Sequence, residues 1–118
     1  MPKRVFVVDD ECSIADSLAA ILRMSGYDTT ALYDAEAALS ACNCHAPDLV
    51  ISDVMMPGMT GIELAIQIKE RYPGCKVLLF SGVATTADLL EQARDQGHDF
   101  ELLAKPVHPA DLLAKIAA

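Results

Sequence analysis

The sequence predicts an α/β domain whose core is a doubly wound, five-stranded parallel sheet of order 2-1-3-4-5 with five helices. Short apolar runs, suited to buried strands, alternate five times with longer segments of helical period. This alternation is typical of units in which right-handed crossovers cover both faces of a parallel sheet. The order 2-1-3-4-5 is the natural arrangement for five such strands. The 118 residues are 53% hydrophobic, which suits a single domain with a substantial core.

The first strand is expected at residues 4–8, where four apolar residues in succession indicate burial on both faces. Ser13 is expected to cap the helix that follows, with Asp16 as the acidic residue of a capping box. Gly26 is expected to end that helix. A second, more polar strand is predicted at residues 27–32.

Asp34 is expected to cap a second helix at residues 35–44. The third strand is predicted at residues 49–52, so that Asp53 stands directly at its end. A loop containing Pro-Gly then leads to a third helix at residues 61–71.

The remaining elements are two strands and two helices. The strands are predicted at residues 76–80 and 100–104, since both runs are apolar and short. One helix is expected to start at residue 85 or 86 and to stop near Gly97. The last helix is expected to begin at Pro109, because proline suits the first turn of a helix.

The charge of the chain limits its partners. The sequence has 17 acidic and 9 basic residues, which gives a net charge of −8. Such a domain lacks the basic footprint of a nucleic-acid-binding protein and is repelled by an anionic membrane surface. No apolar stretch approaches the ~20 residues of a membrane span, and the first apolar run is too short for a signal peptide. We therefore expect a cytoplasmic protein with no direct contact to nucleic acid or membrane.

The four cysteines are expected to be free thiols. Nothing in the sequence suggests secretion, which disfavours disulfides. The segment Cys42-Asn43-Cys44-His45 could be half of a zinc site, but a second pair of ligands at zinc spacing is missing from the sequence.

Polar side chains follow four of the predicted strands. The carboxyl ends of parallel strands share one edge, and ligands bind where the strand order reverses. The residues at these ends are Asp9, Asp10, Asp53, Ser81 and Lys105. Each of them alone is explained as a cap, a turn residue or a surface charge, but all of them together favour a site.

The residue types at this edge suit phosphoryl chemistry. Three carboxylates repel one another, and a hard divalent cation such as Mg²⁺ removes that repulsion. A lysine and a hydroxyl suit the oxygens of a phosphoryl group in transfer. A carboxylate can itself be the nucleophile and form an aspartyl-phosphate. Asp53 stands alone at its strand end and is therefore the best candidate for the acceptor.

Four segments of the chain resemble the receiver domain of two-component response regulators: VFVVDDE, DLVISDVMMPGMTG, LLFSG and LLAKP. The resemblance covers nearly the whole chain, with the segments in the right order and at the right spacing. It implies that residues 1–118 form a single receiver domain with the flavodoxin-like fold and no output domain.

The resemblance also implies roles for the site residues. Asp53 is the expected phosphoacceptor, and the Ser81 hydroxyl and the Lys105 ammonium group are expected to contact the phosphoryl group. The expected Mg²⁺ ligands are Asp9 (mainly through water), Asp10, Asp53 and the backbone carbonyl of Met55.

The implied donor is a phosphohistidine on a sensor histidine kinase or a histidine phosphotransfer protein. Phosphorylation is expected to switch a surface that binds a downstream protein or an output domain. The domain would catalyse only its own phosphorylation and dephosphorylation, so we do not expect a turnover enzyme. The apolar residues Leu102, Leu103 and Val107 suggest a weak homodimer.

Two positions depart from the commonest pattern of the family. Leu102 stands where many receivers have a tyrosine or phenylalanine, so the usual aromatic switch is missing; we expect Phe100 to bury its ring elsewhere. Met55 is apolar where some relatives carry a polar side chain, which predicts an altered hydrolysis rate.

Three other functions remain as alternatives. A degenerate receiver would bind partners without phosphorylation, although the site residues are retained. A flavin mononucleotide carrier would need a phosphate-binding loop where this chain has Asp9-Asp10-Glu11. A phosphatase of the haloacid dehalogenase type would need an Asp-x-Asp motif and a cap domain.

Overall fold

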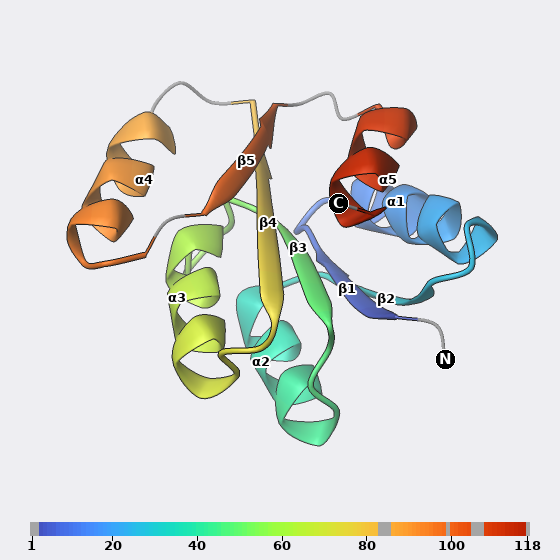
Figure 1. The fold of residues 1–118 in the computed structure, drawn as a ribbon, viewed down its shortest axis with the longest axis horizontal. Coiled ribbons are helices and arrows are strands. Elements are labelled where there is room, and N and C mark those ends of the chain that lie inside the picture. Colours follow the sequence, from blue (N-terminus) through green and yellow to red (C-terminus); the bar gives the residue numbers. More distant parts are fainter. Residues whose placement is uncertain (1–2, 83–85, 99, 105–107, 118) are drawn as a thin grey trace.

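Strands and helices alternate along the chain in the computed structural model, which describes residues 3–82, 86–98, 100–104 and 108–117 (Figure 1). The strands are β1 (Arg4–Val8), β2 (Asp28–Leu32), β3 (Leu49–Asp53), β4 (Lys76–Ser81) and β5 (Glu101–Ala104). The helices are α1 (Cys12–Met24), α2 (Ala35–Cys44), α3 (Gly61–Arg71), α4 (Thr86–Asp95) and α5 (Pro109–Ala117).

The strands form one parallel sheet of order β2-β1-β3-β4-β5. This confirms the predicted fold class and strand order. The order reverses between β1 and β3, which are neighbours although β2 lies between them in the sequence. Val8 of β1 lies opposite Ser52 of β3, so the carboxyl ends of these two strands are level.

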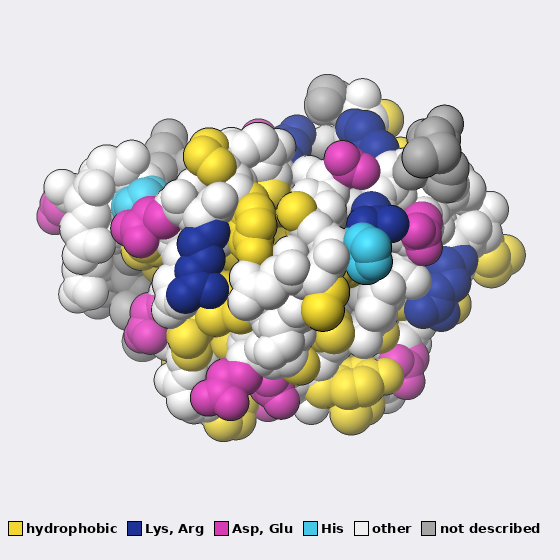
Figure 2. Space-filling view, turned by 90° about the horizontal axis from the view of Figure 1, so that it is seen from below, with side chains coloured by type: hydrophobic (Ala, Val, Ile, Leu, Met, Phe, Trp, Pro, Cys, Tyr) yellow, Lys and Arg dark blue, Asp and Glu magenta, His cyan; other side chains and the backbone are white. Residues whose placement is uncertain are grey.

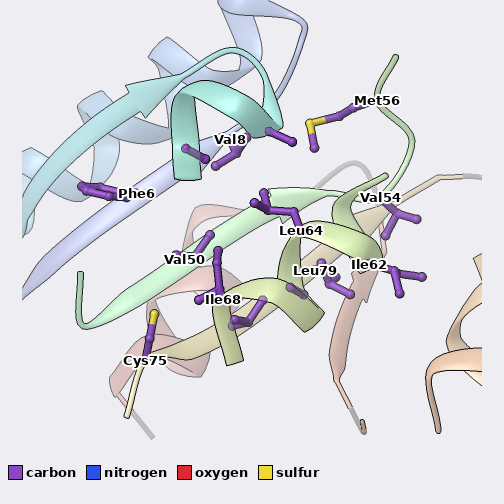
Figure 3. Packing of buried hydrophobic residues seen from close by; sticks show 14 of the residues in the cluster. Phe6, Val8, Val50, Val54, Met56, Ile62, Leu64, Ile68, Cys75 and Leu79 are labelled. Carbon is purple, nitrogen blue, oxygen red and sulfur yellow. The ribbon is translucent and has the colours of Figure 1, made fainter. Parts of the chain in front are cut away.

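Helices cover both faces of the sheet (Figure 1). One apolar cluster joins the sheet to α1 and α5, through residues such as Val7, Leu22, Ile51, Phe80 and Leu112. The other joins it to α2, α3 and α4, and Figure 3 shows its packing, with side chains that include Phe6, Val8, Val50, Leu64 and Ile68. Successive residues of β1 enter opposite clusters, which explains why its four apolar residues are all buried, as predicted.

The start of α1 differs from the prediction. Ser13 is not the N-cap: the helix begins at Cys12, and the cap residue Glu11 makes no side-chain capping bond. The Asp9 carboxylate accepts the Glu11 N–H at 3.0 Å, so the chain turns into the helix before it reaches Ser13. Asp16, the predicted partner of Ser13, instead accepts a 2.6 Å hydrogen bond from the Tyr33 hydroxyl.

The other capping predictions agree with the structure. Asp34 caps α2 by accepting the Ala37 N–H at 2.7 Å. Gly26 follows α1 with φ of +95°, a conformation that favours glycine. The structure adds a cap that was not predicted: Thr60 caps α3 by accepting the Glu63 N–H at 3.2 Å.

The amino ends of the strands present a mixed surface. Seen from this side, basic and acidic side chains are interspersed with hydrophobic ones (Figure 2). Arg4 forms an ion pair of 3.9 Å with Asp28 at this end of the sheet. Among the described residues, no helix is both long and apolar enough to cross a membrane.

Candidate metal site at the carboxyl edge of the sheet

Three aspartates meet where the strand order reverses. Asp9 directly follows β1 and Asp53 is the last residue of β3, one residue further than the strand was predicted to run. One carboxylate oxygen from each of Asp9, Asp10 and Asp53 lies within 4.8 Å of the other two. Asp9 and Asp53 are buried and Asp10 is exposed. The cluster is therefore anchored inside the protein and faces solvent on one side.

The donor set fits Mg²⁺. At metal–oxygen distances of 2.0–2.1 Å, oxygens of an octahedral site lie roughly 3 Å apart when adjacent and roughly 4.2 Å apart when opposite. Carboxylate oxygens that already lie within 4.8 Å of one another need only small movements to reach those separations. A cation at this position would offset their mutual repulsion.

The backbone around Asp53 is fixed from two sides. The Val54 N–H donates to the Phe80 carbonyl at 3.1 Å, and the Gly61 N–H donates to the Val54 carbonyl at 2.8 Å. The buried Ser52 hydroxyl donates to the Asp53 carbonyl at 2.9 Å. Neither Ser52 nor Gly61 was predicted to belong to the site, although each breaks its local pattern. Ser52 is polar in an apolar strand, and Gly61 is a poor helix former that starts a helix.

Ser81 lies on the neighbouring strand. It is the last residue of β4 and is buried, with 7% of its surface exposed. Asp53 pairs with Phe80, so Ser81 lies one position further along β4. On its other side Ser81 pairs with Ala104, the last residue of β5. Lys105, the next residue in the chain, lies outside the described residues.

Met55 lies in the loop two residues after Asp53, and it is 43% exposed.

The structure thus brings part of the predicted site to one edge of the sheet. The three aspartates form a cluster, and Ser81 ends the adjacent strand. The roles of Asp53, Ser81, Lys105 and Met55 stay predictions.

The region of β5 shows where Leu102 and Phe100 lie. Leu102, the position of the expected departure from the family pattern, is 39% exposed. Phe100 is half-buried against the α2–α3–α4 cluster and stacks on the His98 ring, with centroids 6.0 Å apart. The ring of Phe100 is thus partly buried, and it lies before the strand rather than within it. Val107, part of the suggested dimer surface, lies outside the described residues.

A parallel sheet of order 2-1-3-4-5 with an acidic cluster at the point of strand reversal defines a flavodoxin-like domain with a candidate cation site. The family model described as the response regulator receiver domain matches residues 5–117. The chain belongs to this family, as its sequence motifs predicted.

Proteins of similar sequence support the same family assignment. The chain is 33% identical over 118 residues to the DNA-binding response regulator MtrA of Mycobacterium tuberculosis H37Rv, covering 100% of this chain and 50% of MtrA. It is 36% identical over 117 residues to the response regulator protein FleR of Pseudomonas aeruginosa, covering 99% of this chain and 24% of FleR. The chain therefore spans half or less of the length of these relatives.

Solved structures agree in fold. A CheY-like receiver domain protein from Methanospirillum hungatei aligns with a TM-score of 0.89 at 32% identity, over 99% of this chain and 92% of that one. The receiver domain of NtrX from Brucella abortus aligns with a TM-score of 0.83 at 32% identity, over 96% of this chain and 94% of that one.

Proposed function

We propose that this domain accepts a phosphoryl group on Asp53 from a phosphohistidine donor, with Mg²⁺ at the acidic cluster. The observation that carries the proposal is the meeting of Asp53 with Asp9 and Asp10, within 4.8 Å, in a chain of the receiver family. A carboxylate placed beside two others is well suited to be both a metal ligand and a nucleophile.

Each residue of the site has a separate role in the proposed phosphoryl transfer. One oxygen of Asp53 forms the new bond to phosphorus while the bond from phosphorus to the donor imidazole breaks. The imidazole leaves with the electron pair of that bond and takes up a proton. The other Asp53 oxygen, Asp10 and the Met55 carbonyl would hold Mg²⁺, with Asp9 acting mainly through water. When bound, the ion supplies positive charge that offsets the negative charge of the carboxylates and of the phosphoryl oxygens.

Ser81 and Lys105 complete the proposed site. The Ser81 hydroxyl donates a hydrogen bond to a phosphoryl oxygen, and the Lys105 ammonium group pairs with another. Ser81 stands next to Phe80, the partner of Asp53 in the sheet, which supports this assignment. The polar groups proposed to meet the phosphoryl group thus come from the ends of two neighbouring strands, β3 and β4, and from the residue after β5.

The proposed donor is a sensor histidine kinase or a histidine phosphotransfer protein in the cytoplasm. The phosphorylated domain then acts on a downstream protein or an output domain. This part rests on the relatives, which have half or more of their length outside the region that this chain matches. The net charge of −8 argues that these residues do not contact nucleic acid themselves.

The test is phosphorylation by acetyl phosphate with Mg²⁺, followed by intact mass measurement. The wild-type protein is expected to gain one phosphoryl group, and Asp53→Asn none. The matched control is Asp34→Asn, the same substitution at a helix cap where asparagine serves equally well. Labelling of Asp53→Asn at the wild-type level would place the acceptor elsewhere. An unlabelled wild-type protein would favour the phosphorylation-independent interaction module.

A further inference from the structure

We propose that Gly61 is a positioning residue of the candidate site, acting together with Ser52. Because glycine has no side chain, the first turn of α3 can pack closely against the backbone of Asp53. This contact fixes the direction of the Asp53 carboxylate. The inference rests on the proposed function for its effect on phosphorylation, but not for its effect on metal binding.

The close approach at Gly61 leaves no room for a side chain. A Cβ atom there would lie 2.0 Å from the Asp53 carbonyl oxygen, 2.8 Å from the Asp53 carbonyl carbon and 3.0 Å from the Ser52 hydroxyl. The backbone of Gly61 is not left-handed, unlike that of Gly58 with φ of +77°. Space, and not conformation, therefore demands glycine here.

The contact is part of a fixed arrangement around the acceptor. The Ser52 hydroxyl donates to the Asp53 carbonyl at 2.9 Å, on the side where Gly61 packs. The Gly61 N–H donates to the Val54 carbonyl at 2.8 Å, while the Val54 N–H is held by β4. The peptide that follows Asp53 thus lies between α3 and β4. The Asp53 carboxylate is therefore attached to a backbone that cannot shift without moving α3 or β4.

Such fixation matters for a metal ligand that is also a nucleophile. Groups that orient a ligand from behind typically change metal affinity by about 10- to 100-fold when they are altered. Displacement of a reacting group by about 1 Å can cost about 100-fold in rate. A methyl group at Gly61 requires that the start of α3 and the backbone of Asp53 move apart by about 1 Å, because contacts below 3.0 Å are not tolerated and the nearest would be 2.0 Å.

The experiment compares Gly61→Ala with Gly74→Ala. Gly74 lies just beyond the far end of α3, where a Cβ atom meets nothing within 4 Å. Calorimetric titration with Mg²⁺ alone is done well below each unfolding midpoint, followed by labelling with acetyl phosphate. Gly61→Ala is expected to weaken Mg²⁺ binding about 10-fold or more and to slow labelling about 100-fold. Gly74→Ala is expected to match the wild type in both.

A purely structural role for Gly61 predicts a different result. Gly61→Ala would then lower the unfolding midpoint, but the folded protein would bind Mg²⁺ and accept label as the wild type does, which overturns the proposal. Ile68→Val is a second control, since it weakens the packing of α3 away from the site. It is expected to lower the midpoint with no change in Mg²⁺ affinity.

Ser52→Ala keeps the proposal testable if Gly61→Ala does not fold. It removes only the hydroxyl that holds the Asp53 carbonyl, and we expect about 3- to 10-fold weaker Mg²⁺ binding. Unchanged Mg²⁺ affinity and labelling in Ser52→Ala overturn the proposal. An unlabelled wild type with altered Mg²⁺ affinity in the variants would reject the proposed function and keep the positioning role.

Discussion

Replacing Asp10 by asparagine is expected to raise the stability of the protein when no divalent cation is present. Asp10, Asp9 and Asp53 each have a carboxylate oxygen within 4.8 Å of the others, and asparagine removes one charge with almost no change in shape. Two of the three repulsive pairs in the cluster are thereby lost. The substitution is also expected to remove most of the stabilisation that Mg²⁺ gives to the wild type.

The magnitude follows from the separation of the charges. Two unit charges 4.8 Å apart repel by about 0.9 kcal/mol in a water-like dielectric and by about 3.5 kcal/mol at an effective dielectric of 20. Asp10 is exposed, so the lower figure applies, and salt screens it further. For two pairs we expect a net gain of about 1 kcal/mol, or about 3–6 °C in the unfolding midpoint.

Thermal unfolding at low ionic strength, with a chelator or with Mg²⁺, measures both effects. Mg²⁺ at 100 times its Kd is expected to stabilise the wild type by about 2.7 kcal/mol, and Asp10→Asn far less. The order of stability of the two proteins therefore reverses between the two conditions. A lower midpoint for Asp10→Asn in chelator, or an equal response of both proteins to Mg²⁺, would refute the electrostatic reasoning.

Three further predictions concern the fold. Asp34→Ala removes the acceptor of the Ala37 N–H and is expected to cost about 1 kcal/mol in chemical denaturation, whereas Asp34→Asn is expected to be nearly neutral. Ile68→Ala leaves a cavity at a fully buried position of α3 and is expected to cost about 2–5 kcal/mol in the same assay. Burial, with a smaller contribution from the nearby Cys42, raises the pKa of the Cys75 thiol from 9.0 to about 11. The thiol therefore ionises at a lower pH in the unfolded chain than in the folded protein. Its contribution to the free energy of unfolding is complete below pH 9 and falls as the pH rises towards 11. Cys75→Ala is expected to flatten this fall in denaturation curves, and an equally steep fall would contradict the assignment.

The elements could be predicted from the sequence because burial on two faces leaves a plain signal. Four apolar residues in succession, as in β1, are found where a strand is covered on both sides. The start of α1 could not be predicted in the same way. Ser13 looked like a cap by local rules, but Asp9, held by the end of β1, bonds Glu11 and turns the chain earlier. The contact between Asp9 and Glu11, which the sheet positions, therefore outweighed the local capping preference of Ser13.

The candidate site likewise contains residues that could be predicted from the sequence and residues that could not. That Asp9, Asp10 and Asp53 share one edge follows from strand order alone, and the sequence was sufficient to expect it. The packing of Gly61 against Asp53 depends on the path of the intervening loop, which has no periodic pattern to interpret. Residues that act at strand ends were therefore found, while those that support them from behind were missed.

The size of the switch that Leu102 can provide is limited by its own burial. Complete burial of a leucine side chain contributes about 1.5–3 kcal/mol, and Leu102 is already covered except for 39% of its surface. Covering the remainder upon phosphorylation would therefore add about 0.6–1.2 kcal/mol, a shift of about 3- to 8-fold in a two-state equilibrium. A shift from 1:99 to 99:1 needs about 5.5 kcal/mol.

Under the proposed function, we expect most of the switching free energy to come from groups that contact the phosphoryl group. Among the described residues, Ser81 at the end of β4 is the candidate for such a contact. Ser81→Ala is expected to abolish most of the change in amide hydrogen exchange of α4 and β5 upon phosphorylation by acetyl phosphate. Leu102→Ala is expected to alter the populations by no more than about 8-fold. Loss of the whole response in Leu102→Ala, with Ser81→Ala unaffected, would instead show that the aliphatic side chain carries the signal.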